Sequence, residues 1–128
     1  MRLLLDTHSF LWFVAGSTSL SATARAHLED PGNDLFLSVA SLWEMAIKIS
    51  LGKLSLDEPF DELIPQQLAA SGIATLPVRF AHVAAVARLP FHHRDPFDRM
   101  IIAQAQVDGL PVVGNDAEWG NYGIQRIW

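Results

Sequence analysis

Short apolar runs alternate with longer segments of helical periodicity, and this alternation constrains the fold more than any other feature of the chain. The runs predict buried strands at 2–5, 35–38, 73–78 and 110–114, and an edge strand at 124–128. Short apolar strands separated by helices are typical of a sheet whose strands run mostly in parallel. The sequence therefore predicts an α/β fold around a mostly parallel sheet.

The segments between the strands predict helices at 9–16, 21–30, 39–54, 58–72, 79–89 and 96–107. The clearest is 39–54, because its apolar residues follow the three-four spacing of a buried stripe. Pro65 inside 58–72 predicts a kink or two short helices. No repeat or linker interrupts the pattern, and 128 residues suit one domain with a real core, so we expect a single domain over 1–128.

Charge and hydropathy exclude some classes of protein. The formal net charge of −5 argues against a protein that grips nucleic acid mainly through a general basic surface. It does not exclude a nuclease, because acids gathered around metal ions also lower the net charge. No apolar run approaches the roughly 18–20 residues that span a bilayer, and the N-terminal run lacks the features of a signal peptide. We therefore expect no membrane partner and a cytoplasmic location.

Two acids follow predicted strands directly. Asp6 comes after 2–5, and Asp116 comes just after 110–114. In open parallel sheets, ligands bind in the crevice at the carboxyl ends of the strands, so both acids are candidate site residues. Each also has a structural interpretation: Asp6 could cap the next helix, and Asp116 could serve only the turn in "GNDAEW".

Two further acids lie on predicted helices. Three and four residues after Asp98 come Ile101 and Ile102, which belong to a buried stripe. A carboxylate at the head of such a stripe needs a partner, although the helix dipole alone would favour an acid in the first turn. Glu44 lies at the edge of the stripe in 39–54, and its alternative is a surface pair with Lys48.

Smaller polar residues near these acids are candidates for supporting roles. Asp95 before Pro96 predicts a helix N-cap, and a supporting role near the site is the alternative. Thr7 and Ser9 could hydrogen-bond a metal-bound water or cap a helix.

Basic residues bracket the Asp98 turn and could contact phosphates: His92, His93, Arg94 and Arg99. The alternative is a polar loop in which Arg99 pairs with Asp95 across one helical turn.

The joint pattern of acids points to a metal site. Several carboxylates in one crevice would repel one another and raise each other's pKa, and a divalent cation removes that repulsion. Ligands that are all oxygen suit Mg²⁺ or Mn²⁺ rather than Zn²⁺. Such ions polarise phosphoryl oxygens and activate water, so no Ser or Cys nucleophile is needed.

Four motifs, in order, resemble those of PIN-domain ribonucleases of the VapC toxin type from VapBC toxin–antitoxin pairs: "LLLDTHSFLW" (3–12), "SVASLWEMAIKISLGKL" (38–54), "HHRDPFDRMIIAQA" (92–105) and "GNDAEWGNYGI" (114–124). The resemblance covers the chain essentially end to end. It implies a three-layer α/β/α PIN domain and a Mg²⁺- or Mn²⁺-dependent endoribonuclease that leaves a 5′-phosphate and a 3′-hydroxyl. The catalytic and metal-binding quartet would be Asp6, Glu44, Asp98 and Asp116.

The resemblance also implies partners. It implies an RNA substrate, a homodimer, and a small VapB-like antitoxin that obstructs the site, with 39–72 forming part of its groove.

One position departs from the pattern: the family usually has Thr or Ser two residues before the last acid, and Gly114 stands there. Activity could be reduced, or Thr7 or Ser9 could compensate.

Two rival functions follow from the same residues. A catalytically weakened PIN domain would act as an RNA- or antitoxin-binding module, although retention of all four acids argues against it. A phosphatase with an aspartyl nucleophile would want a second Asp two residues after the first, and "DTH" supplies His8 there.

Overall fold

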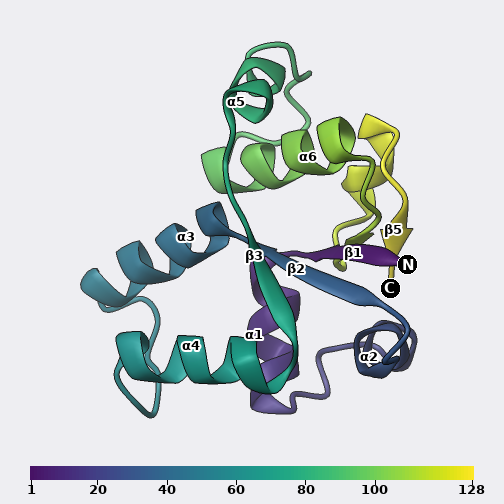
Figure 1. Cartoon of the computed structure of the whole chain (residues 1–128). Helices are drawn as coiled ribbons and strands as arrows, with labels where there is room; N and C mark the ends of the chain where they lie inside the picture. The colour runs from purple at the N-terminus through teal and green to yellow at the C-terminus, as the bar shows by residue number, and fades with distance from the viewer.

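A central sheet of five strands, all parallel, organises the computed structural model, which describes residues 1–128 (Figure 1). The strand order is β3-β2-β1-β4-β5. The strands are β1 (Arg2–Leu5), β2 (Asp34–Ser38), β3 (Ile73–Leu76), β4 (Val112–Val113) and β5 (Arg126–Ile127). The helices are α1 (Thr7–Ala15), α2 (Ala22–Glu29), α3 (Val39–Ser50), α4 (Phe60–Ala70), α5 (Phe80–Val86), α6 (Pro96–Asp108) and the 3₁₀ helix η1 (Ala117–Tyr122).

Helices cover both faces of the sheet, which gives the three-layer α/β/α arrangement expected from the sequence (Figure 1). Strand β1 shows why the strands are apolar throughout. Leu3 and Leu5 belong to the core with α1, α2 and α3, whereas Leu4 belongs to the core with α5, α6 and η1. A strand that is buried on both faces must be apolar at every position, so it lacks the alternation of a half-exposed strand.

The strand order changes direction at β1. The chain moves from β1 to β2 and β3 on one side, and then places β4 and β5 on the other side. The crevice between the carboxyl ends of β1 and β4 is therefore the topological switch point, where ligands bind in sheets of this kind. Leu5 pairs with Val113 in register, so the residues that follow both strands lie side by side.

The predicted elements are confirmed, with corrections at several boundaries. Helix α3 ends at Ser50, not at residue 54, and α1 begins at Thr7 because Asp6 caps it. The 3₁₀ helix η1 was not predicted. The prediction of two short helices around Pro65 is wrong, since α4 is one helix. Pro65 lacks the N–H that would bond to the Asp61 carbonyl, and both residues are exposed.

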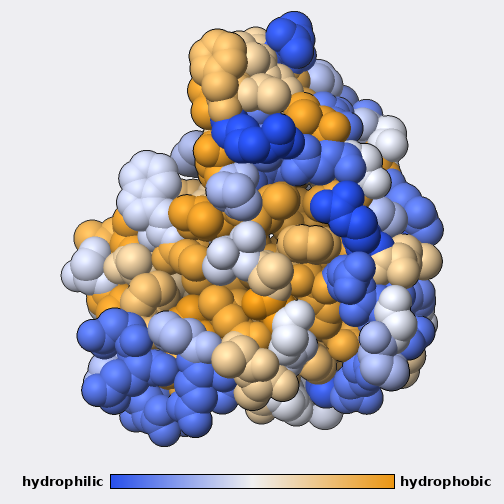
Figure 2. All heavy atoms as spheres, in the orientation of Figure 1, coloured by the Kyte–Doolittle hydropathy of each residue, from blue (hydrophilic) through white to orange (hydrophobic).

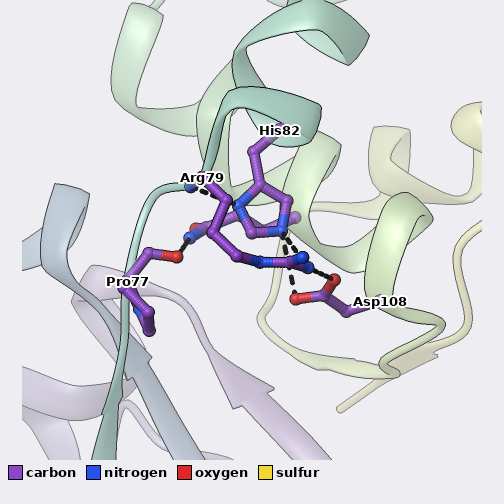
Figure 3. A network of polar contacts seen from close by, with 5 residues as sticks. Pro77, Arg79, His82 and Asp108 are labelled. Atoms are coloured by element: carbon purple, nitrogen blue, oxygen red, sulfur yellow. Dashed lines mark hydrogen bonds and ion pairs between the residues drawn. The ribbon is translucent and has the colours of Figure 1, made fainter.

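A buried polar network joins the start of α5 to the end of α6 (Figure 3). The fully buried His82 accepts a hydrogen bond from the Arg79 backbone N–H at Nδ1, over 2.9 Å. Its Nε2 lies 3.1 Å from Oδ2 of Asp108. Because Nδ1 is an acceptor, the ring proton is on Nε2 and is donated to Asp108. This pairing satisfies the polar atoms that α5 buries against α6.

None of the helices combines the length and the hydrophobicity that a membrane crossing requires.

Candidate active site

Asp6 occupies the switch point directly after β1. Its Oδ1 accepts the Ser9 backbone N–H over 2.7 Å and thereby caps α1. Its Oδ2 makes no hydrogen bond within the chain and faces Gly114, where an added Cβ would stand 3.1 Å away. The capping and site interpretations of Asp6 are therefore compatible. Burial raises the pKa of this carboxyl, the neighbouring Ser9 opposes the rise, and the charge of Glu44 adds to it.

Glu44 reaches the same crevice from α3. It is only 4% exposed, and its Oε1 accepts the Thr7 hydroxyl over 2.7 Å. Its Oε2 pairs with the Lys48 ammonium over 2.8 Å. The alternative of a Glu44–Lys48 pair is thus correct about the partner and wrong about the location, because Glu44 is buried. Lys48 supplies positive charge to an acidic pocket, and the hydrogen bond with Glu44 raises the pKa of Lys48.

Asp98, in the first turn of α6, forms an acidic pocket with Asp6 and Glu44, whose charges act on it. Burial, followed by the charges of Asp95 and Glu44, raises the pKa of Asp98 to about 6, and Asp6 adds a smaller contribution. No side-chain oxygen of Asp98 accepts a hydrogen bond from the chain. A half-buried carboxylate with acidic neighbours and no donor is in an environment that suits a cation.

Asp95 caps α6, as the Asp-Pro pair predicts. Its Oδ1 accepts the backbone N–H groups of Phe97 and Asp98 over 2.9 and 3.0 Å. Asp95 is exposed, and its charge is one of those that raise the pKa of Asp98. It therefore shapes the pocket electrostatically while it caps the helix.

Asp116 lies in the loop after β4, and its side-chain hydrogen bonds are with His93 and Glu118 and not with the other three acids. Its Oδ1 caps η1 by accepting the Glu118 N–H over 3.0 Å, and its Oδ2 lies 2.6 Å from Nε2 of His93. Burial raises the pKa of Asp116, but the hydrogen bonds from His93 and from Glu118 outweigh burial, so the pKa is lowered. The side chains of His93, Asp116 and Glu118 could together hold a metal ion, because one ligand atom from each lies within 4.8 Å of the others.

The remaining candidates take different positions. Thr7 is buried between Ser41 and Glu44; since a hydroxyl carries one proton, Thr7 donates to Glu44 and Ser41 donates to Thr7. Ser9 supports Asp6 through its backbone N–H, and its buried hydroxyl has no partner in the chain. Arg94 is exposed and forms no ion pair within the chain, so its guanidinium is free to contact a phosphate.

Arg99 stabilises the loop before α6. Its buried guanidinium donates to the backbone carbonyls of Val86, Leu89, Pro90 and His93. The alternative pairing of Arg99 with Asp95 is wrong, because these carbonyls occupy the guanidinium.

Sequence reasoning missed the pairing of His93 with Asp116 and the part played by Ser41. His93 is 23 residues from Asp116 and Ser41 is 34 residues from Thr7, so no local spacing connects either pair. The only available clue was that Ser41 and Glu44 share a helix face three residues apart.

The donor set fits a divalent cation. Asp6 Oδ2 and both oxygens of Asp98 lack hydrogen-bond donors from the chain, while Asp6 and Asp98 have raised pKa values. Carboxylate oxygens of this kind are the ligands that hard divalent cations prefer. The arrangement can hold such a cation between three elements: the end of β1, helix α3 and the first turn of α6.

A sheet of this topology with acids at its switch point is the arrangement of the PIN domain. The chain matches the PIN-domain family model over residues 3–124 and belongs to that family. Among curated proteins, it is 42% identical over 60 residues to Ribonuclease VapC16 of Mycobacterium tuberculosis. That alignment covers 47% of this chain and 43% of the relative.

Solved structures share the fold at low sequence identity. The toxin–antitoxin complex VapBC2 of Rickettsia felis, bound to a fragment of its promoter DNA, matches with a TM-score of 0.73 and 14% identity, over 100% of both chains. VapBC-1 of nontypeable Haemophilus influenzae matches with a TM-score of 0.66 and 15% identity, over 98% of this chain and 96% of that one. At these identities the likeness concerns the fold.

Proposed function

We propose that the chain is a divalent-metal-dependent endoribonuclease of the VapC kind. The observation that carries the proposal is the convergence of Asp6, Glu44 and Asp98 from three elements on one pocket, where their charges act on one another. Membership of the PIN-domain family and the likeness to Ribonuclease VapC16 support the reaction class. Phosphodiester hydrolysis needs no protein nucleophile when carboxylates hold a metal ion.

In this proposal Asp6, Glu44, Asp98 and Asp116 hold Mg²⁺ or Mn²⁺. The chemistry that comes with a bound divalent cation is water activation and neutralisation of phosphate charge. Thr7 fixes the Glu44 carboxylate, and Lys48 offsets part of the negative charge of the pocket. We place the reaction in the cytoplasm, within a single PIN domain.

The proposed partner is a small VapB-like antitoxin. The complexes that share the fold contain such antitoxins, and this chain offers a hollow of about 390 Å³ between α1, α3 and the loop 53–56. Thr7 and Lys48, which contact Glu44, line this hollow. A peptide segment seated there would lie beside the acids and obstruct them, which is consistent with the expected groove in 39–72.

We further propose a homodimer that buries a second, apolar hollow. This hollow of about 540 Å³ is lined by residues that include Val39, Trp43, Val78, Phe91 and Met100. Figure 2 shows further apolar side chains gathered between α3, α4 and β3, with hydrophilic ones toward the periphery of this view. Contiguous exposed apolar surface of this kind favours a protein partner.

The test of the proposed activity is a cleavage assay. Purified chain, freed of antitoxin, is mixed with a pool of structured RNAs and Mg²⁺ or Mn²⁺, beside the Asp98→Asn variant and an EDTA control. The exposed Asp61→Asn on α4 is the matched control for loss of one acid. We expect discrete cuts with 5′-phosphate ends from wild type and Asp61→Asn, and none from Asp98→Asn or in EDTA. Cutting by Asp98→Asn equal to wild type would overturn the assignment.

A further inference from the structure

Both carboxylate oxygens of Asp116 are held by other groups of the chain, as those of Glu44 are. The backbone of η1 binds one oxygen through Glu118, and the imidazole of His93 binds the other over 2.6 Å. Position 114, two residues earlier, has no side chain that could hold the carboxylate from the strand side. The orientation of the Asp116 carboxylate therefore depends on a histidine from a distant part of the chain.

The proton on the His93 ring can be placed from its contacts. An ionised carboxylate only accepts hydrogen bonds, so Nε2 of His93 carries a proton and donates it to Asp116. The other ring nitrogen, Nδ1, lies 2.9 Å from the hydroxyl of Tyr122. In the neutral ring Nδ1 is an acceptor, and the Tyr122 hydroxyl donates to it. A chain of two hydrogen bonds thus runs from Tyr122 through His93 to Asp116.

The backbone around His93 is held independently of Asp116. The buried Arg99 guanidinium donates to the His93 carbonyl over 3.2 Å, and it also binds two carbonyls earlier in the same loop and the carbonyl of Val86 at the end of α5. The His93 ring packs on the Tyr122 ring, with centroids 5.5 Å apart, and only 9% of its side chain is exposed. A ring that is buried and anchored in this way can impose an orientation on the half-exposed carboxylate of Asp116.

We propose that His93, with its tautomer set by Tyr122, is a positioning residue that fixes the orientation of the Asp116 carboxylate. The inference rests on the proposed function insofar as Asp116 is a metal ligand. Hydrogen bonds to ligating carboxylates orient them, and removing such partners typically lowers metal affinity about 10–100-fold. His93 acts through Asp116 and does not itself touch the metal or the RNA.

The test measures Mn²⁺ affinity by calorimetry in wild type, His93→Ala, His93→Gln and Tyr122→Phe, with thermal unfolding of each metal-free variant as a check on folding. We expect about a tenfold loss of affinity in His93→Ala, from the usual effect of such partners. We expect most of that loss to be recovered in His93→Gln, whose amide N–H can donate to Asp116. Tyr122→Phe should lose about twofold, since it removes one contact. His27→Ala, which changes a partly exposed histidine on α2, should bind as wild type does.

A double-mutant cycle separates positioning from ligation. If His93 acts through Asp116, adding His93→Ala to Asp116→Ala changes Mn²⁺ affinity by less than twofold. Full additivity of the two losses would overturn the proposal. So would disappearance of the His93 Nε2 proton from nitrogen NMR spectra when diamagnetic Mg²⁺ is added, because that result would make His93 a ligand in the cluster with Glu118.

Neither readout requires RNA, so the two proposals can fail separately. Coupling of His93 to Asp116 in a chain that cleaves no RNA would reject the proposed ribonuclease and retain the positioning role. Normal affinity in a well-folded His93→Ala would reject the positioning role and leave the ribonuclease standing.

Discussion

Gly114 lies against Asp6 so closely that a Cβ added to the glycine would stand 3.1 Å from Oδ2 of the aspartate. The same Cβ would stand 3.1 Å from the ring of the buried Trp119. Both distances are shorter than ordinary van der Waals contact, so a side chain at position 114 must displace one of these neighbours. The glycine is explained by packing around Asp6 and Trp119.

We therefore predict that Gly114→Ala and Gly114→Thr weaken the site. Overpacking should lower the free energy of unfolding by about 1–3 kcal/mol, and displacement of Asp6 should lower metal affinity. Urea unfolding and Mn²⁺ titration measure the two effects. Gly120→Ala is the matched control, because no atom lies within 4 Å of a Cβ added there. A Gly114→Thr variant that is more active and equally stable would show that the missing hydroxyl, and not packing, limits this site.

The raised pKa of Asp98 predicts an unusual pH dependence of stability without metal. The pKa of Asp98 is about 6 in the folded chain and has an ordinary value near 3.8 when unfolded, so the folded state binds the proton more tightly. The contribution of Asp98 to stability is present below about pH 4 and is lost as pH rises through about 6. In EDTA at pH 7, Asp98→Asn should be more stable than wild type by on the order of 1 kcal/mol, after allowance for solvent screening.

Thermal unfolding of wild type and Asp98→Asn from pH 4 to pH 8 in EDTA measures this effect. The two curves should converge toward pH 4 and separate above pH 6. Added Mg²⁺ should stabilise wild type and not the variant, because ligand binding to the folded state adds to stability. Equal stability of the two proteins across the whole range would contradict the assigned environment of Asp98.

Thr7→Val tests the hydroxyl that fixes Glu44. The substitution keeps the shape of the side chain but removes the donor to Oε1, so we expect at least a tenfold loss of Mn²⁺ affinity. Stability should fall by about 1–2 kcal/mol, since a buried carboxylate oxygen loses its partner. Ser41→Ala is the control, because it leaves the bond from Thr7 to Glu44 in place. If Ser41→Ala lowers affinity as much as Thr7→Val, the hydroxyl of Thr7 has no special role.

His82→Leu tests the polar network between α5 and α6 (Figure 3). The variant leaves the Arg79 backbone N–H and Asp108 without their buried partner, so we expect a loss of about 2–4 kcal/mol in the free energy of unfolding. Arg79→Ala should lose less than about 1 kcal/mol, because 56% of the Arg79 side chain is exposed in its pair with Asp108. Denaturant unfolding of both variants provides the comparison. If Arg79→Ala loses more free energy of unfolding than His82→Leu, the stabilisation comes mainly from the ion pair between Arg79 and Asp108.

The sequence by itself determined the elements and the identity of the acids. Continuous apolar runs predict strands buried on both faces, and the position of Asp6 after such a run predicts its place at the sheet edge. The Asp95–Pro96 pair likewise predicts the start of α6, which the cap confirms. These inferences succeed because each depends on residues that are close together in the chain.

Only the tertiary structure decided which side chains pair across long sequence separations. His93 binds Asp116 and Thr7 binds Glu44 because the parallel sheet brings segments that are distant in the sequence to one edge. The crowding of Gly114 between Asp6 and Trp119 arises in the same way, from the adjacency of β1 and β4. Local spacing carries no information about such contacts, since strand order and packing set them.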